Sequence, residues 1–288
     1  VTVLPLAGDT RPVRGDVPGC PVARASGSGG TAKLLTGTVA WKGDDLFVGS
    51  GSGTIVRWDR ATGAPLDTVG TDFGALWSMQ FSDDGARLYV NGAGQSDSAA
   101  DERGTLQAYD SSDWRPIWDV AQPYLGAVVD DPTHDAVRVA DAFNGGTVVT
   151  LDRATGQPSG RVFPAPTGSA CTALLSPDAH HLTTGSCQKA ALVVWSTDGA
   201  GALMRRVGDR RPGFSVDTIN ADGTHVVSNN AEGPADVDLA TGAITPMTGF
   251  AAAVYASTGR LFAVDDRGQQ GISTEPVEVP SGDVSFTW

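Results

Sequence analysis

Cysteine and long apolar runs are scarce in this sequence of 288 residues. Three cysteines, Cys20, Cys171 and Cys187, are too few for a scaffold held by disulfides, and none lies in a closely spaced pair that would indicate zinc or redox chemistry. The longest apolar stretches, such as 251–256, fall well short of the about 20 residues that a membrane helix needs. Packing must therefore hold the chain together, and we expect no transmembrane segment.

Positive charge is scarce as well, since 20 lysines and arginines stand against 33 aspartates and glutamates and leave a net charge of −13. An acidic chain repels nucleic-acid phosphates and anionic lipids, so we expect no direct nucleic-acid contact and no membrane contact from this segment. One basic group remains, at Arg205, Arg206, Arg210 and Arg211. It could contact a partner's carboxylates, but a solvated edge strand is the preferred interpretation.

A phrase of two strands joined by a turn occurs five times, for example GTIVRWDRATGAPL at 53–66 and GTVVTLDRATGQPS at 146–159. Its first strand ends on Asp59, Asp110, Asp152, Ser196 and Asp238, at spacings of 51, 42, 44 and 42. This period is typical of a four-stranded propeller blade, which must stack on neighbours to bury its apolar face. We predict an all-β fold, a β-propeller of about six to seven four-stranded antiparallel blades.

The turns of the repeat have recognisable chemistry. Upstream of each phrase, segments such as MQFSDDGARLYV and DTINADGTHVVS predict a strand, a tight turn and a second strand. In the RATG and LATG turns, aspartate and threonine can bond to turn amides while Gly63, Gly156 and Gly242 accept a left-handed backbone. We interpret these residues as turn formers rather than catalytic groups.

Two regions follow from this pattern. Residues 34–288 form the propeller, with six complete units and a last blade that begins at 283 and stays incomplete. Residues 1–33 are rich in Gly, Pro and Ser and form an arm or linker, of which the first eight residues could supply a closing strand. The alternative is six blades that close on themselves. Because the chain starts at Val1 without a signal peptide, we expect a fragment or a processed chain.

Sequence signatures of catalysis are missing: there is no nucleophile elbow, no metalloprotease helix, no phosphate loop and no dinucleotide fingerprint. The histidines at 134, 180 and 225 fall near the same turn of successive units, which should hold them too far apart to share a metal. Acidic clusters lack the spacing of a calcium loop. We therefore predict no catalytic residues, no metal and no cofactor. Cys171 and Cys187 could pair across a hairpin, although two buried thiols are preferred.

Aromatic residues recur in the loops that lead into the first strand of a unit. Those loops should converge near the propeller axis, where rigid rings make good binding contacts. Polar residues from other loops of the same face complete the set. The predicted partner-binding residues are Phe73, Tyr124, Phe143, Phe214, Phe250, Asn91, Asp97, Asp101, Asn144 and Asn229. The alternative is that the rings pack between blades and stabilise the ring.

The Trp58-Asp59 pair, its variants Tyr109-Asp110, Leu151-Asp152 and Trp195-Ser196, and the SDDG and SPDA turns resemble the WD-repeat β-propellers in a degenerate, bacterial form. The family's Gly-His pair before the first strands is absent, so the buried network of many members is not expected. The low lysine count and the frequent Ala, Gly, Asp and Arg are typical of a high-GC, actinobacterial genome.

This resemblance implies a non-catalytic interaction, sensor or scaffold module with a protein or peptide partner. It further implies the C-terminal repeats of a larger bacterial signalling or transcription-regulating protein, whose remaining domains would contact DNA and hydrolyse nucleotide. The expected location is cytoplasmic, or extracellular if Cys171 pairs with Cys187. The alternative function is a propeller enzyme or ligand-binding protein, lactonase-like or quinoprotein-like, with a cation site in the axial channel.

Overall fold

The computed structural model describes residues 2–3, 13–14, 38–49, 53–59, 62–94, 104–121, 126–140, 147–164, 170, 172–186, 191–198, 201–208, 216–230, 233–255, 261–265 and 277–279. Nearly all of them belong to short strands and the turns between these strands. Within these ranges, no helix has the length and apolar character to cross a membrane. The three cysteines and the residues after 279 lie outside the described ranges.

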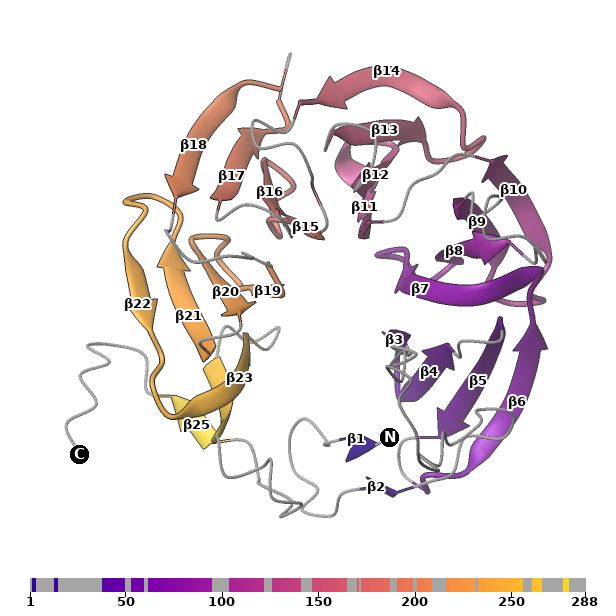
Figure 1. The fold of residues 1–288 in the computed structure, drawn as a ribbon. Coiled ribbons are helices and arrows are strands. Elements are labelled where there is room, and N and C mark those ends of the chain that lie inside the picture. Colours follow the sequence, from indigo (N-terminus) through magenta and orange to yellow (C-terminus); the bar gives the residue numbers. More distant parts are fainter. Residues whose placement is uncertain are drawn as a thin grey trace, which may run out of the picture.

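Six sheets, which we number 1 to 6 along the chain, stand around a central axis (Figure 1). Sheet 1 contains β3 (Thr38–Lys42), β4 (Asp45–Gly49), β5 (Thr54–Asp59) and β6 (Pro65–Gly70). Sheet 2 contains β7 (Phe73–Phe81), β8 (Arg87–Gly94), β9 (Gly104–Asp110) and β10 (Pro116–Ala121). Sheet 3 contains β11 (Val128–Asp131), β12 (Ala136–Ala140), β13 (Val148–Asp152) and β14 (Pro158–Phe163), with the 3-10 turn η2 (Pro132–His134) after β11.

The remaining sheets follow the same plan. Sheet 4 contains β15 (Thr172–Leu175), β16 (His181–Gly185), β17 (Ala191–Ser196) and β18 (Leu203–Gly208). Sheet 5 contains β19 (Thr218–Ile219), β20 (His225–Asn230), β21 (Gly233–Asp238) and β22 (Ile244–Pro246). Sheet 6 has three described strands, β23 (Phe250–Tyr255), β24 (Leu261–Asp265) and β25 (Val277–Val279). A separate pair, β1 (Thr2–Val3) with β2 (Val13–Arg14), is drawn between sheets 6 and 1 in Figure 1.

Each sheet pairs its strands antiparallel in chain order, from a first strand near the axis to a last strand at the perimeter (Figure 1). The first strands of neighbouring sheets contact one another around the ring, as β3 does β7 and β7 does β11. This arrangement confirms the predicted all-β propeller of four-stranded antiparallel blades. How residues 1–33 and the chain after 279 take part in closing the ring stays a prediction.

The core lies between the sheets, where apolar residues at alternate strand positions meet. Phe47 of β4, Phe81 of β7 and Leu88 of β8 belong to one buried cluster between sheets 1 and 2. Trp58 of β5 is 8% exposed and packs with Leu46 in a neighbouring cluster. The perimeter strands β6 and β18 are mostly exposed, because only one of their edges has a partner. Burial therefore decreases from the axis outward.

The predicted turn chemistry is confirmed between the third and fourth strands. The Asp59 carboxylate accepts the Thr62 N–H and hydroxyl at 2.7 and 3.0 Å, and Asp152 holds the corresponding Thr155. Gly63 and Gly156 have φ of 67° and 70°, the left-handed region that glycine enters without steric cost. Strands alternate in direction, so these turns and those after the first strands share one face of the ring, the turn face. The other connections lie on the opposite loop face.

Candidate functional site

Most of the predicted partner-binding residues lie outside the described ranges. These are Tyr124, Phe143, Phe214, Asp97, Asp101 and Asn144. Asn229 lies in β20, where its backbone pairs with Pro234 of β21. Phe250 begins β23 and is partly buried against a cluster that contains Val227 and Met247. The proposed loop-face contact therefore stays a prediction.

Two of the predicted contact residues are buried and must be reassigned to the core. Phe73 has no exposed surface and packs with Leu76 and Phe47 between sheets 1 and 2, as the alternative of rings packed between blades expected. The pairing of β7 with β8 shifts register between Phe73 and Ala75, next to this buried ring. Asn91 is also fully buried, because β8 continues to Gly94, and its Nδ2 donates to the Gly126 carbonyl at 2.8 Å. Neither side chain reaches a partner on the surface.

A recess opens on the turn face between sheets 1 and 2, with a volume of about 660 Å³, and we call it the groove. Its sheet 1 wall comes from β4, β5, β6 and the turn after β3, and its sheet 2 wall comes from the end of β7 and the two turns of that sheet. Aromatic and charged side chains line it together. They are Phe47, Phe81, Trp114, Lys42, Arg57, Asp44, Asp45, Asp67, Asp83 and Asp84.

The aromatic part of the groove is a packed stack of three rings. Phe47 and Phe81 meet edge to face with centroids 4.8 Å apart, and the Trp114 ring lies 5.5 Å from Phe47. Trp114 is partly exposed and occupies the turn position that Gly63 and Gly156 hold in other sheets. Its φ of 62° is left-handed, a conformation that costs a residue with a side chain about 1–2 kcal/mol. A bulky ring is thus held at this rim against the local backbone preference.

The charged part of the groove is acidic in sum. Five aspartates face one lysine and one arginine among the lining residues, which leaves three negative charges in excess. Arg57 is held by Asp45 at 2.6 Å and lies 3.6 Å from Asp67. Lys42 Nζ donates to Ser111 Oγ at 2.7 Å and lies 5.8 Å from the centre of the Phe81 ring. The two basic groups of the groove are therefore engaged with residues of the protein itself.

The Asp84 carboxylate remains ionised at any physiological pH. The Ser82 hydroxyl and the Ala86 N–H donate to its Oδ1 at 2.6 and 3.0 Å, and these bonds lower the pKa of Asp84 to about 2. Its side chain is 55% exposed at the groove's rim. The groove accordingly presents fixed negative charge beside the partly exposed Trp114 ring.

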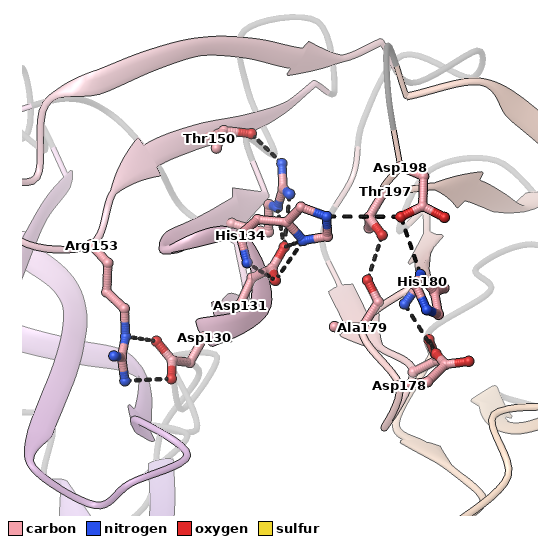
Figure 2. A network of polar contacts seen from close by, with 12 residues as sticks. Asp130, Asp131, His134, Thr150, Arg153, Asp178, Ala179, His180, Thr197 and Asp198 are labelled. Carbon is pink, nitrogen blue, oxygen red and sulfur yellow. Dashed lines mark hydrogen bonds and ion pairs between the residues drawn. The ribbon is translucent and has the colours of Figure 1, made fainter.

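The next junction, between sheets 2 and 3, is filled by an arginine of the chain itself (Figure 2). Arg153 Nε lies 2.9 Å from Asp130 Oδ1, and Nη2 lies 3.1 Å from Oδ2 and 3.3 Å from Asp84 Oδ2 of sheet 2. Tyr89 donates its hydroxyl to Asp130 at 3.0 Å, and burial together with that carboxylate raises the pKa of Tyr89 to about 12. The Trp118 indole N–H donates to the Arg153 carbonyl at 3.1 Å. A guanidinium thus joins two sheets.

Ser111 is the counterpart of Arg153 in the groove. Each residue follows the aspartate of its turn, and each donates its backbone N–H to the first hairpin of its own sheet, Ser111 to Ala86 at 3.0 Å and Arg153 to Asp135 at 3.1 Å. Strand register likewise places Phe81 where sheet 3 has Asp130, since they pair with Leu88 and Val137. Sheet 2 therefore has a short hydroxyl at the position of the arginine in sheet 3, and the Lys42 ammonium of sheet 1 donates to it at 2.7 Å.

The junction between sheets 3 and 4 carries the polar network on the other side of Figure 2. Fully buried Asp131 accepts from Arg138 at 2.7 Å and lies 2.9 Å from His134 Nδ1. His180 Nδ1 lies 3.1 Å from Asp198 Oδ1, and His134 Nε2 lies 3.9 Å from the same atom. His134 of sheet 3 and His180 of sheet 4 thus lie near the same Asp198 carboxylate. Histidines of successive units come closer together here than the sequence predicts.

The ionisable groups of these junctions provide fixed charge. Among the described residues, no three His, Cys, Asp or Glu side chains are placed to hold a metal ion together. The carboxylates Asp84, Asp152 and Asp178 have lowered pKa values because hydroxyls and turn amides donate to them, which suits fixed charge rather than proton transfer. Hydrogen bonding to Asp198 raises the pKa of His180, an exposed group at a sheet junction.

Sequence reasoning missed the groove residues, although one signal was present. The turn after Asp110 reads SSDW, where the turns after Asp59 and Asp152 read RATG. Trp114 therefore stands in place of a glycine, and Ser111 in place of an arginine. The charged rim gave no such signal, because Asp67 and Asp83 come from separate sheets. Their approach depends on how sheets 1 and 2 stack.

Comparison with known proteins supports the fold alone. No protein-family model matches the chain, and no curated protein is similar to it in sequence. A solved structure with a similar fold is the β-propeller domain of Cps50 (Swd1) from Myceliophteria thermophila. The two share 12% sequence identity over 80% of each chain, with a TM-score of 0.60. At that level of identity, the likeness establishes that the chain folds as a β-propeller.

Proposed function

We propose that this propeller is a non-catalytic interaction module that binds a segment of a partner protein in the groove between sheets 1 and 2. The groove itself carries the proposal, since it is an open recess of about 660 Å³ with an aromatic base and a charged rim. Propeller folds serve many functions, so the residues of the site, and not the fold, indicate the role of this one. A peptide segment fits such a recess through one or two anchoring side chains.

The groove differs from the neighbouring junction in a way that favours a binding role. Arg153 fills the junction between sheets 2 and 3 and is only 14% exposed, so that junction is closed by the chain itself. The groove has Ser111 at the same place and a partly exposed tryptophan at its rim. Keeping Trp114 in a left-handed conformation opposes stability, and residues of that kind concentrate at functional sites.

The proposal can be tested by panning a displayed peptide library against the purified chain and measuring the selected peptides by calorimetry. Ser111→Arg should fill the groove from within, as Arg153 fills the next junction, and should abolish binding. Ser159→Arg is the matched control, because Ser159 is exposed on β14 and outside the groove, and it should leave affinity unchanged. Failure to select any peptide, or equal affinity for Ser111→Arg and wild type, would overturn the proposal.

The loop face is a second candidate surface, favoured by the recurrent aromatic residues in its loops. Tyr124, Phe143, Phe214 and Phe250 would contact the partner there, with Asn144 and Asn229 beside them. Selected peptides that keep their affinity for Ser111→Arg but lose it in a Phe214→Ala and Phe250→Ala double variant would place the binding site on this face. The wider role within a larger bacterial signalling or transcription-regulating protein of the cytoplasm rests on the sequence resemblance.

A further inference from the structure

We infer that the groove between sheets 1 and 2 takes an arginine side chain of the partner segment, at the rim where Trp114 lies beside carboxylates. The inference rests on the proposed function and specifies the chemistry of the ligand. It starts from the repeat, in which the chain binds a guanidinium between the next two sheets. In the groove, Phe81 stands at the position of Asp130, so the carboxylates for a bound guanidinium must come from the rim.

The inference is first supported by the equivalent positions of Ser111 and Arg153 in their sheets. Ser111 and Arg153 hold equivalent backbone positions, each tied by its N–H to the first hairpin of its sheet. The guanidinium of Arg153 extends between sheets and contacts carboxylates from both of them, Asp130 of sheet 3 and Asp84 of sheet 2. In the groove, the Ser111 hydroxyl spans only as far as the Gly85 carbonyl, at 2.6 Å. The Lys42 ammonium donates to that hydroxyl at 2.7 Å, so a partner's guanidinium would bind further out, at the rim that Trp114 and the aspartates form.

The second support is charge. The lining of the groove has three more aspartates than basic residues. Asp67 of β6 and Asp83 of the turn after β7 are exposed on its two walls. A cation that enters between them gains attraction from both sides, and the chain's net charge of −13 draws a basic segment toward the surface before contact. An acidic partner segment would be repelled.

The third support is the aromatic rim, which distinguishes arginine from lysine. The planar guanidinium can stack on an indole face and direct several N–H donors to carboxylates, whereas an ammonium is a compact and strongly hydrated charge. Trp114 provides an indole that is partly exposed at the groove and backed by the Phe47 ring. Since the groove pairs that indole with carboxylates, its chemistry suits a guanidinium better than an ammonium.

The test uses N-acetyl-arginine amide, with the lysine and citrulline analogues as probes, and records the indole N–H signals of the tryptophans by NMR. The signal that disappears in Trp114→Gly identifies Trp114. Glycine fits the left-handed turn, so this variant should keep its fold. We expect the arginine probe to shift the Trp114 signal saturably, about tenfold more tightly than neutral citrulline and several-fold more tightly than lysine.

Variants of the rim supply the controls. Asp67→Asn and Asp83→Asn should each weaken the arginine probe by about two- to tenfold, and added salt should weaken it further. Asp119→Asn removes the same charge from an exposed position of β10 outside the groove and should leave the affinity unchanged. Citrulline or lysine that binds as tightly as arginine would overturn the inference, as would an arginine probe that does not shift the signal.

Failure of the inference can be separated from failure of the proposed function. Library peptides without arginine that bind wild type and lose affinity in Ser111→Arg would overturn the inference while the groove remains the binding site. Peptides whose affinity is insensitive to Ser111→Arg would overturn both. Selected peptides in which replacing one arginine by citrulline removes binding would support both.

Discussion

The guanidinium of Arg153 and the carboxylate of Asp130 form a two-point ion pair, with Nε 2.9 Å from Oδ1 and Nη2 3.1 Å from Oδ2. Asp130 is 2% exposed and comes from β11, at the strand position that Phe81 holds in β7. One sheet therefore uses an internal ion pair where the preceding sheet uses an apolar ring. The difference between the closed junction and the open groove begins with this exchange.

Removing the arginine of this pair should be costly. Arg153→Leu leaves the Asp130 charge buried and should lower the free energy of unfolding by about 3–5 kcal/mol. The double variant Asp130→Leu with Arg153→Leu removes both charges but leaves the Tyr89 hydroxyl without its acceptor, so it should recover only part of the loss. Urea unfolding followed by circular dichroism measures both. A double variant less stable than Arg153→Leu alone would contradict this account.

The Trp114→Gly substitution should be nearly neutral for stability. It relieves the left-handed strain of about 1–2 kcal/mol and gives up the packing of a partly exposed ring, so the net change should lie within about 1 kcal/mol. Gly156→Ala is the contrasting variant at the equivalent turn, because its Cβ would stand 2.7 Å from the Trp118 ring at a φ of 70°. Gly156→Ala should be clearly destabilised in urea unfolding. A larger loss of unfolding free energy in Trp114→Gly than in Gly156→Ala would contradict the role given to backbone strain.

Trp58→Ala should act on the core alone. The ring is 8% exposed and packs with Leu46, Val48 and Val56, so its removal should lower the free energy of unfolding by about 3–5 kcal/mol. Peptide affinity at the groove should not change at temperatures where the variant is folded. Thermal unfolding together with calorimetry measures the two quantities, and unchanged stability would disprove the structural role of the ring.

Acid should destabilise the propeller through its turn aspartates. Hydrogen bonds from Ser82 and Ala86 hold the pKa of Asp84 at about 2, below the value of 3.8 of an unfolded chain, and the pKa values of Asp152 and Asp238 are lowered as well. The unfolded chain binds protons first as the pH falls, so this stabilisation is complete above about pH 4 and is lost toward pH 2. Unfolding free energies measured across that range should show the decline.

A turn variant provides the control for the acid prediction. Asp84→Asn removes one of the titrating groups and should reduce the pH dependence between about pH 4 and pH 2, while Asp152 and Asp238 keep their share. Asp119→Asn, at an exposed position of β10, should leave the slope unchanged. Equal slopes for wild type and Asp84→Asn would contradict the assignment of this stabilisation to the turn.

The repeat and its turns could be predicted from the sequence because their interactions are local. Asp152 and Thr155 bond within one turn of the chain, so the RATG phrase contains the whole interaction. The junctions depend instead on residues far apart in the sequence. Arg153 meets Asp84 only because two sheets stack, and an arginine also follows the aspartate at Arg60, so the residue type does not identify its partner.

Burial at the strand ends was harder to predict for a related reason. Phe73 and Asn91 were assigned to loops, yet each belongs to a strand that runs further than the sequence pattern indicated. Gly94 pairs with Phe73, so β7 and β8 remain joined up to the loop face, and both side chains are enclosed by neighbouring elements. An extended hairpin of this kind depends on pairing between two strands, which a single-strand pattern does not contain.

Pairing in chain order also bears on how the molecule folds. Every strand of sheets 1 to 5 pairs with its immediate neighbour in the sequence, so each pairing closes a short loop at a small entropic cost. Folding can then begin in any one sheet and spread to the next along the chain, as in other repeat architectures. Contacts between residues far apart in the sequence join successive sheets, as Arg153 and Asp84 do, and such long-range contacts form more slowly than the pairing within a sheet.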